Sequence, residues 1–231
     1  MTRYDRQLAL PEIGTEGQRR LSEAKVVIIG VGGLGSPIAL YLAGAGVGTI
    51  GLVDDDVVSI SNLQRQVLYS EPQQGRPKVL CAKERLESLN GDVTVVAHNA
   101  RLNSDNAKDI ISHYDIVIDG TDNFATRFLI SDACEALHKP YVYGAINAFE
   151  GQVAVLCKGH ATYRTLFPDE HETLAMPHPG KAVVGVTPAV VGSVEAGQAL
   201  QLICEYGEPL IDRLWTIDLR TMQSFILEIG N

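Results

Sequence analysis

The most constraining feature of the sequence is an apolar run at residues 26–29 that breaks directly into a glycine-rich turn. Such a run suits a central strand of a parallel sheet, because both faces of that strand are covered. Gly30 allows the tight turn, Gly32 lets the backbone approach a phosphate, and Gly35 lets the next helix pack closely. With Gly33 between them, these glycines predict a phosphate-binding loop and a helix whose N-terminus faces an anion. Alone, the pattern is weak, because an ordinary turn also fits it.

A second strand, expected at residues 49–53, ends at Asp54, which lies about twenty residues after the glycines. A carboxylate at that position can accept hydrogen bonds from the hydroxyls of a ribose. The strand, the helix and the terminal acid together favour nucleotide binding.

The remaining pattern predicts an α/β fold with a Rossmann-like, doubly wound sheet. Helices are expected at residues 36–45, 77–90, 104–112 and 125–137, and strands at 93–97, 116–118, 141–146 and 152–157. The turn at 149–151 is too short for a parallel crossover, so an antiparallel C-terminal extension should follow the parallel N-terminal half. A buried helix at 188–205 and a hairpin at 214–219 and 224–229 complete the sheet.

Two segments are expected to lie outside the core. Residues 1–22, with a short helix at 14–21, form an N-terminal arm, and residues 159–182 form a long loop rich in proline and histidine. Long loops in compact domains are usually functional, so this loop is interpreted as a lid, with a solvated connection as the alternative. Its histidines, His160, His171 and His178, have no spacing typical of a metal site.

Composition narrows the classes of function. The 231 residues suit a single domain, and the 45% hydrophobic content is ample for its core. The net charge of −9 argues against nucleic acid as a partner, because phosphate backbones require clustered Lys and Arg. No stretch predicts a membrane span or a signal peptide, so a cytoplasmic protein is expected. The four cysteines, at 81, 134, 157 and 204, form no Cys-x-x-Cys pair and are expected to be buried and reduced.

Polar residues gather where the second and fourth strands end, which is where open α/β sheets bind ligands. The second strand leads into a segment at 54–66 that has many hydrogen-bonding side chains. The fourth leads into Asp119-Gly120-Thr121-Asp122-Asn123. Both segments are predicted to be binding loops.

The motifs now in view resemble those of a known group of enzymes. They occur in order along nearly the whole chain: Arg3-Tyr4-x-Arg6-Gln7, the glycine loop, Asp54-x-Asp56, Ser61-Asn62-Leu63-x-Arg65-Gln66, Lys78 and Thr121-Asp122-Asn123. They are similar to the ubiquitin-activating-enzyme-like adenylyltransferases of the ThiF, MoeB and HesA type. The resemblance implies that the C-terminal glycine of a ubiquitin-fold sulfur carrier, ThiS- or MoaD-like, attacks the α-phosphate of ATP. The products would be an acyl-adenylate and pyrophosphate, for thiamine or molybdopterin biosynthesis.

The resemblance also implies roles for single residues. Arg65 and Lys78 would hold the phosphates, Asp54 the ribose, and Asp122 the Mg²⁺ that bridges phosphate oxygens. The wider nucleotide site would include Gly32, Gly33, Gly35, Asp56, Ser61, Asn62, Leu63, Gln66 and Asn123. From position alone, Arg65 also fits a solvated surface residue. Likewise, Asp122 or Asn123 also fits a cap of the following helix.

Arg6 resembles an arginine that the group delivers from one subunit of a homodimer into the site of the other. A homodimer in which Arg6 completes the partner's site is therefore expected. Without the resemblance, Arg6 would be interpreted as a solvated residue of the arm.

The chain departs from the group in two places. Members commonly bind a structural zinc through two Cys-x-x-Cys pairs, but here the first place holds Thr162-Tyr163-Arg164-Thr165, so no zinc is expected. Members also often have a loop cysteine before the buried helix, whereas no cysteine lies between Cys157 and Cys204. The chemistry is therefore predicted to stop at the adenylate.

Two other functions remain open. An NAD-dependent oxidoreductase would explain the glycines and Asp54 but would leave Arg65, Lys78 and Asp122 without a shared purpose. A non-catalytic, carrier-binding subunit would not need the set of nucleotide-site residues.

Overall fold

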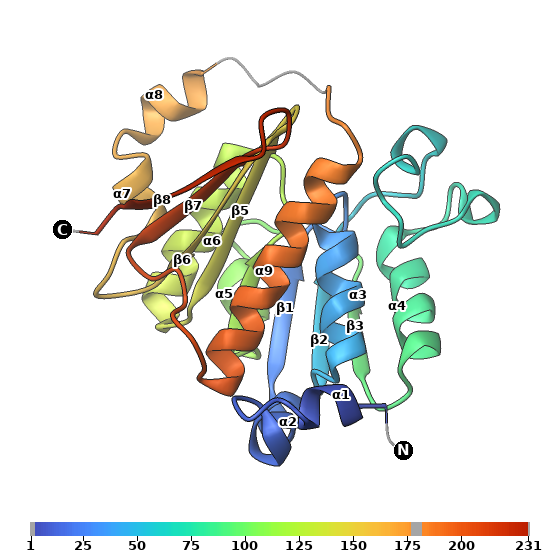
Figure 1. Cartoon of the computed structure of the whole chain (residues 1–231). Helices are drawn as coiled ribbons and strands as arrows, with labels where there is room; N and C mark the ends of the chain where they lie inside the picture. Colours follow the sequence, from blue (N-terminus) through green and yellow to red (C-terminus); the bar gives the residue numbers. More distant parts are fainter. Residues whose placement is uncertain (1–2, 177–181, 231) are drawn as a thin grey trace.

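A computed structural model describes residues 3–176 and 182–230, and one sheet of eight strands runs through them in the order β3-β2-β1-β4-β5-β6-β7-β8 (Figure 1). The strands are β1 (Lys25–Ile29), β2 (Thr49–Val53), β3 (Thr94–His98), β4 (Ile116–Asp119), β5 (Tyr141–Asn147), β6 (Glu150–Leu156), β7 (Arg213–Asp218) and β8 (Gln223–Glu228). The expected α/β fold and its strands are confirmed, and no strand end differs from its expected position by more than two residues.

The first five strands are parallel and the last three join antiparallel. Ile29 is level with both Val53 and Asp119, so β1, β2 and β4 end together at one edge of the sheet. The chain turns from β5 into β6 through Ala148, whose φ is +51°, and Phe149. The prediction that the short turn makes the sheet mixed is therefore confirmed, and the polar strand ends share one edge.

Helices cover both faces of the parallel half (Figure 1). One buried cluster joins β1 and β2 to α3 (Gly35–Ala45), α4 (Lys78–Leu89) and α9 (Val186–Cys204), and the other joins β1 and β4 to α5 (Ala107–Ser112) and α6 (Phe124–Leu137). The expected helices are confirmed. Two 3₁₀ turns, Ile60–Asn62 and Glu71–Gln73, lie between β2 and α4. Within the described residues, no helix combines the length and apolarity that crossing a membrane requires.

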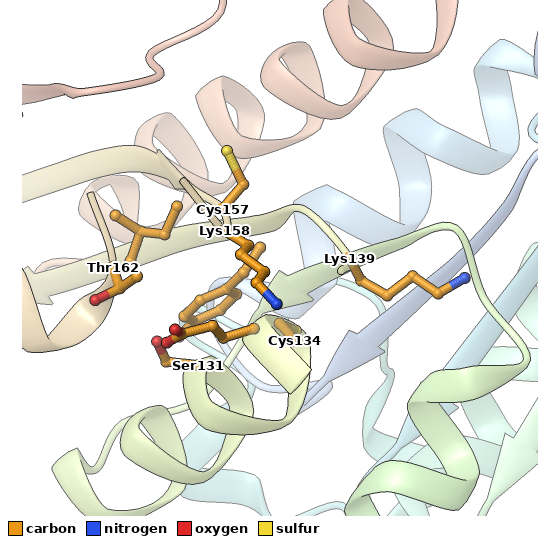
Figure 2. Close-up of a pocket in the computed structure, with 9 residues that line it drawn as sticks. Ser131, Cys134, Lys139, Cys157, Lys158 and Thr162 are labelled. Atoms are coloured by element: carbon orange, nitrogen blue, oxygen red, sulfur yellow. The ribbon is translucent and has the colours of Figure 1, made fainter. Parts of the chain in front are cut away.

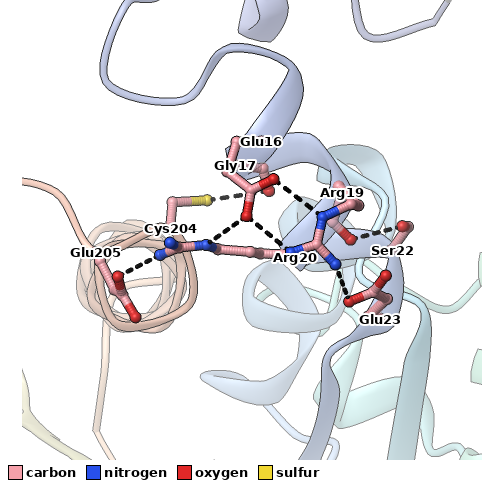
Figure 3. Close-up of polar contacts among 8 residues, drawn as sticks. All are labelled: Glu16, Gly17, Arg19, Arg20, Ser22, Glu23, Cys204 and Glu205. Carbon is pink, nitrogen blue, oxygen red and sulfur yellow. Dashed lines mark hydrogen bonds and ion pairs between the residues drawn. The ribbon is translucent and has the colours of Figure 1, made fainter.

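The N-terminal arm consists of α1 (Asp5–Leu8) and α2 (Gly14–Glu23), at the amino ends of the strands (Figure 1). The expectation that residues 1–22 lie outside the core is wrong for Leu21, which is fully buried in it. Figure 3 shows why α2 is held there: Arg20 pairs with Glu205 just after α9, and the Cys204 thiol lies 3.6 Å from the Gly17 carbonyl. The buried face of α2 therefore covers the core at the amino ends of the strands.

The segment at 159–182 is not the structureless loop that its composition indicated, because it contains α7 (Tyr163–Leu166) and α8 (Glu170–Ala175). Tyr163 is fully buried, with its ring 4.9 Å from that of Phe128 and 5.4 Å from that of Tyr143. Thr162 and Thr165 form a capping box that starts α7. Aromatic burial and capping therefore fix a segment that is otherwise polar. His178 lies outside the described residues.

Candidate active site

The glycine loop connects β1 to α3 at the edge where the parallel strands end. Gly30 has a φ of +88°, and a β-carbon there would lie 2.6 Å from the carbonyl oxygen of Gly120. A β-carbon on Gly35 would collide with the Gly30 carbonyl oxygen. Only glycine fits these two positions, because β1, β4 and α3 approach one another backbone to backbone. The local prediction of strand, turn and helix is confirmed.

Asp54 ties this loop to the next strand. Its Oδ2 accepts a hydrogen bond from the Val31 N–H at 2.8 Å, and its Oδ1 accepts one from the Asp56 N–H at 2.8 Å. Burial raises the pKa of the Asp54 carboxyl, while Lys78 and the two N–H groups act in the opposite direction. Each carboxylate oxygen has two lone pairs, so the residue can still accept ribose hydroxyls. Asp54 thus fixes the glycine loop against the segment that follows β2.

Lys78, the first residue of α4, is buried with 3% of its surface exposed. Its ammonium lies 2.7 Å from Oδ2 of the exposed Asp56, and its backbone N–H donates to the Asp56 carbonyl at 2.9 Å. The structure therefore brings Lys78 to Asp54 and Asp56, and Asp56 orders the loop. A triphosphate would offer the ammonium stronger acceptors than this exposed carboxylate.

The segment from Ser61 to Gln66 packs over the glycine loop. The Cδ atom of Arg65 lies 3.6 Å from the place of a β-carbon on Gly33, and its guanidinium donates to the Ser61 carbonyl at 3.2 Å. Asn62 shapes the turn with its carbonyl, which accepts the N–H groups of the third and fourth residues after it. Leu63 packs against the core.

Gln66 gives a separate indication that this surface receives a polar ligand. It is 4% exposed, its Nε2 lies 3.4 Å from the place of a β-carbon on Gly32, and its Oε1 has no hydrogen-bond partner in the described structure. A buried polar atom without a partner is costly, so it calls for one. A phosphate-bearing nucleotide on Gly32 and Gly33, beside Arg65 and Lys78, fits these residues.

In the loop after β4, some polar residues hold the fold together and one faces solvent without a partner in the described chain. Asp119 is fully buried and pairs with Arg127 at 3.0 Å, so it is a structural residue. Asn123 caps α6 by accepting the Thr126 N–H at 2.9 Å, which confirms the cap that position alone allowed. Asp122 is exposed, and its carboxylate has no partner among the residues that the structure describes. It fits a Mg²⁺ site of the usual kind, in which one carboxylate and the substrate phosphates are the ligands.

Arg6 lies at the other end of the molecule. It is an exposed residue of α1, and the neighbouring Gln7 donates to the Ala45 carbonyl at the C-terminus of α3. The glycine loop is at the N-terminus of that helix, roughly 16 Å away for an 11-residue helix. Arg6 therefore lies far from the site of its own chain, as an arginine for another chain's site would.

A pocket of about 430 Å³ lies beside the Asp119–Asn123 loop, between α6, α7 and the antiparallel strands. Its lining residues include Phe124, Arg127, Tyr143, Gln152, Phe167 and Phe225, and also the acidic Glu150 and Asp218. None of these side chains was predicted from the sequence to line a site. Arg127 had one signal, since it follows Asn123 by four residues on a helix, but the rest depend on how β5 to β8 align.

The segment that enters α9 runs from the turn between β5 and β6 to the glycine loop. The Val184 N–H donates to the Ala148 carbonyl at 3.4 Å, Gly185 touches Gln64, and Pro188 packs against Gly33.

A separate cavity of about 10 Å³ near Cys134 and Cys157, shown in Figure 2, lies at the amino end of β5 and has room for one water. Cys157 is only half buried, unlike the other three cysteines, so the expectation of four buried thiols is wrong at one position.

Residues 4–231 match the sequence pattern of the ThiF family. The chain is 48% identical over 227 residues to a sulfur carrier protein adenylyltransferase of Thermus thermophilus, covering 94% of this chain and 83% of that one. It is 44% identical over 228 residues to a probable adenylyltransferase/sulfurtransferase, MoeZ, of Mycobacterium tuberculosis. That match covers 96% of this chain and 58% of MoeZ. The crystal structure of E. coli MccB with ATP superposes with a TM-score of 0.84 at 25% identity, over 93% of this chain and 66% of that chain. The chain belongs to the ThiF family.

Proposed function

We propose that this protein adenylylates the C-terminal glycine of a ubiquitin-fold sulfur-carrier protein. The observation that carries the proposal is the glycine loop itself: Arg65 packs against its Gly33, and Gly120, two residues before Asp122, packs against its Gly30. Asp54, which binds the loop at Val31, lies in the same segment as Asp56, the partner of Lys78. A pocket of about 430 Å³ lies beside this region. The curated names of the relatives, a sulfur carrier protein adenylyltransferase among them, support the same class of reaction.

The reaction joins two anions. A carboxylate oxygen of the carrier attacks the α-phosphorus of ATP, the bond from that phosphorus to the bridging oxygen breaks, and pyrophosphate leaves. The site must offset the repulsion with fixed positive charge, which Arg65 and Lys78 supply beside the loop N–H groups. Mg²⁺, when held by Asp122, would neutralise the phosphate oxygens. Asp54 would hold the ribose.

The pocket beside Asp122 is proposed to receive the carrier's tail. Aromatic side chains line it and could exclude water from the reacting carboxylate. The segment at 182–185 would lie over the tail between Ala148 and Gln64. A ThiS-like carrier for thiamine and a MoaD-like carrier for molybdopterin both fit this description.

A homodimer is proposed to complete the site, with Arg6 of each chain serving the other. Support comes from the exposure of Arg6 and its distance from its own glycine loop. The proposal includes no structural zinc, because Thr162 and Thr165 occupy a capping box and cannot supply thiolates. It includes no covalent cysteine intermediate, because no cysteine lies between Cys157 and Cys204.

Carrier-dependent exchange of labelled pyrophosphate into ATP tests the proposal. The purified protein should catalyse exchange with ThiS or MoaD that ends in glycine, and not with the same carrier lacking its last glycine. Absence of exchange with every carrier would contradict the proposal. Calorimetric binding of NAD in preference to ATP would instead favour the oxidoreductase.

A further inference from the structure

Arg127 is a buried arginine that joins three parts of the fold at the candidate site. Its Nε lies 3.0 Å from Oδ2 of Asp119, and its Nη2 donates to the carbonyls of Thr121 at 2.8 Å and Gly144 at 3.2 Å. Only 7% of its surface is exposed. One guanidinium thus connects the end of β4, the loop that follows it, and β5.

The loop that carries Asp122 is fixed through its neighbours. Asp119 also accepts hydrogen bonds from the Tyr141 hydroxyl at 2.7 Å, the Thr121 N–H at 2.8 Å and the Thr121 hydroxyl at 2.6 Å. At the other end of the loop, Asn123 caps α6. Arg127 holds the carbonyl directly before Asp122, so the position of that carboxylate depends on the guanidinium.

The same guanidinium is part of the pocket wall. Its carbon lies 5.6 Å from the centroid of the Tyr143 ring, and both residues line the pocket. The Gln152 side chain, another wall residue, donates to the Tyr143 hydroxyl at 2.6 Å. A peptide that fills this pocket would therefore contact Tyr143 and Arg127, the guanidinium that bonds to Asp119 and to the Thr121 carbonyl.

We propose that Arg127 is a positioning residue that couples occupation of the pocket by the carrier's tail to the placement of Asp122 for the magnesium nucleotide. This inference rests on the proposed function. Tail and nucleotide then bind with positive coupling, and the coupling is reciprocal: each tightens the binding of the other by the same factor. The carrier would in this way promote assembly of the metal site that activates it.

Replacing Arg127 by lysine separates coupling from simple charge compensation. Lysine keeps a positive charge for the buried Asp119, but its single ammonium cannot reproduce the fork that reaches Asp119, Thr121 and Gly144 together. Arg164→Lys is the matched control. Arg164 also pairs with an aspartate of α6, Asp132, at 2.8 Å, and lies over the Phe128 ring at 5.0 Å, but it contacts neither Asp119 nor the loop after it.

The experiment is calorimetry of a non-hydrolysable ATP analogue with Mg²⁺, with and without a synthetic peptide ending in Gly-Gly. Wild-type protein and Arg164→Lys should bind the analogue at least about fivefold tighter when the peptide is present. Arg127→Lys should lose this enhancement, while its affinity without peptide changes less and its urea midpoint stays close to that of Arg164→Lys. Retained enhancement in Arg127→Lys would overturn the proposal, as would its loss in both variants.

Two further outcomes keep the inference apart from the proposed function. If wild-type protein exchanges pyrophosphate but shows no enhancement, the coupling is overturned and the function stands. If it neither exchanges pyrophosphate nor binds the peptide, both are overturned. Should Arg127→Lys fail to fold, the double variant Asp119→Asn/Arg127→Gln removes both buried charges, and it should likewise lose the enhancement; retention there would contradict the proposal.

Discussion

The carboxyl group of Glu195 on α9 occupies the space that a side chain on Gly144 of β5 would need. Glu195 is fully buried, and neither of its oxygens has a hydrogen-bond partner in the described structure. Burial, and to a lesser degree the charge of Asp119, raise the pKa of Glu195 well above its ordinary value, against the opposing effect of Arg127. Burial without a hydrogen-bond partner therefore favours the neutral acid over the carboxylate at this position.

Glu195→Gln should accordingly change how stability depends on pH. The folded state holds the proton to a higher pH than the unfolded state, so the wild-type free energy of unfolding falls as pH rises above about 4.5, until the folded pKa is reached. The loss is at most about 1.4 kcal/mol for each pH unit in that window. Glutamine has no such dependence, so the variant should gain relative to wild type between pH 5 and pH 8 in urea unfolding. An equal difference at both pH values would show that Glu195 is ionised in the fold.

Asp122→Ala should nearly abolish adenylate formation and leave the fold intact. Its side chain is exposed and has no partner in the described chain, so removing it costs little stability, whereas a lost metal ligand should lower the exchange rate by about a hundredfold or more. Pyrophosphate exchange and a thermal melt measure the two effects. Asp109→Ala, which removes an exposed carboxylate of α5, is the control and should stay active. Normal turnover of Asp122→Ala would contradict its role.

Arg65→Ala should slow the chemical step by about a hundredfold or more, because a preorganised charge is lost. Arg6→Ala should also be slow if Arg6 acts on the partner's site. Mixed and re-equilibrated, the two variants should recover about a quarter of wild-type activity, because half of the dimers are mixed and each mixed dimer has one intact site. No recovery on mixing would mean that Arg6 does not act across a dimer.

Elemental analysis of the purified protein should find less than stoichiometric zinc. The capping box of Thr162 and Thr165, with the two ion pairs of Arg164 to Asp132 and Glu170, already fixes the start of α7 without thiolate ligands. One zinc per chain would contradict this prediction.

Arg164→Ala removes the two ion pairs that hold the start of α7, so it should lower the thermal midpoint of unfolding by a few degrees.

The lid hypothesis for residues 159–182 stays a prediction. Cleavage near Arg164 should be slow under all conditions, because α7 packs its buried Tyr163 against α6. Cleavage near Lys181, which lies outside the described residues, should slow markedly when carrier and ATP are both present, and little with ATP alone. Equal cleavage rates near Lys181 under all conditions would leave only a connector.

The parts of the fold that are determined by residues close together in the sequence were predictable from it. The glycine loop, the acid that ends β2 and the helix at Lys78 follow from local chemistry, and the turn at 149–151 was too short for anything but a reversal. The sequence did not separate structural from ligand-binding residues in the loop after β4. The structure shows that Asp119 pairs with Arg127 and that Asn123 caps α6. The pocket was beyond sequence reasoning because its walls come from α6, β5, β6, β7 and β8, whose alignment is set by strand register.

β5 is the strand that both halves of the sheet share. Val117 of β4 is aligned with Tyr141, and Tyr141 with Leu156 of β6, so the glycine loop and the pocket are mounted on one continuous hydrogen-bonded framework. Because the two halves share a strand, we expect them to move as one body and not like the lobes of a two-domain enzyme. Whatever closes over the reactants must therefore be loop, and a substitution that slips the register of β5 would misalign both substrates at once.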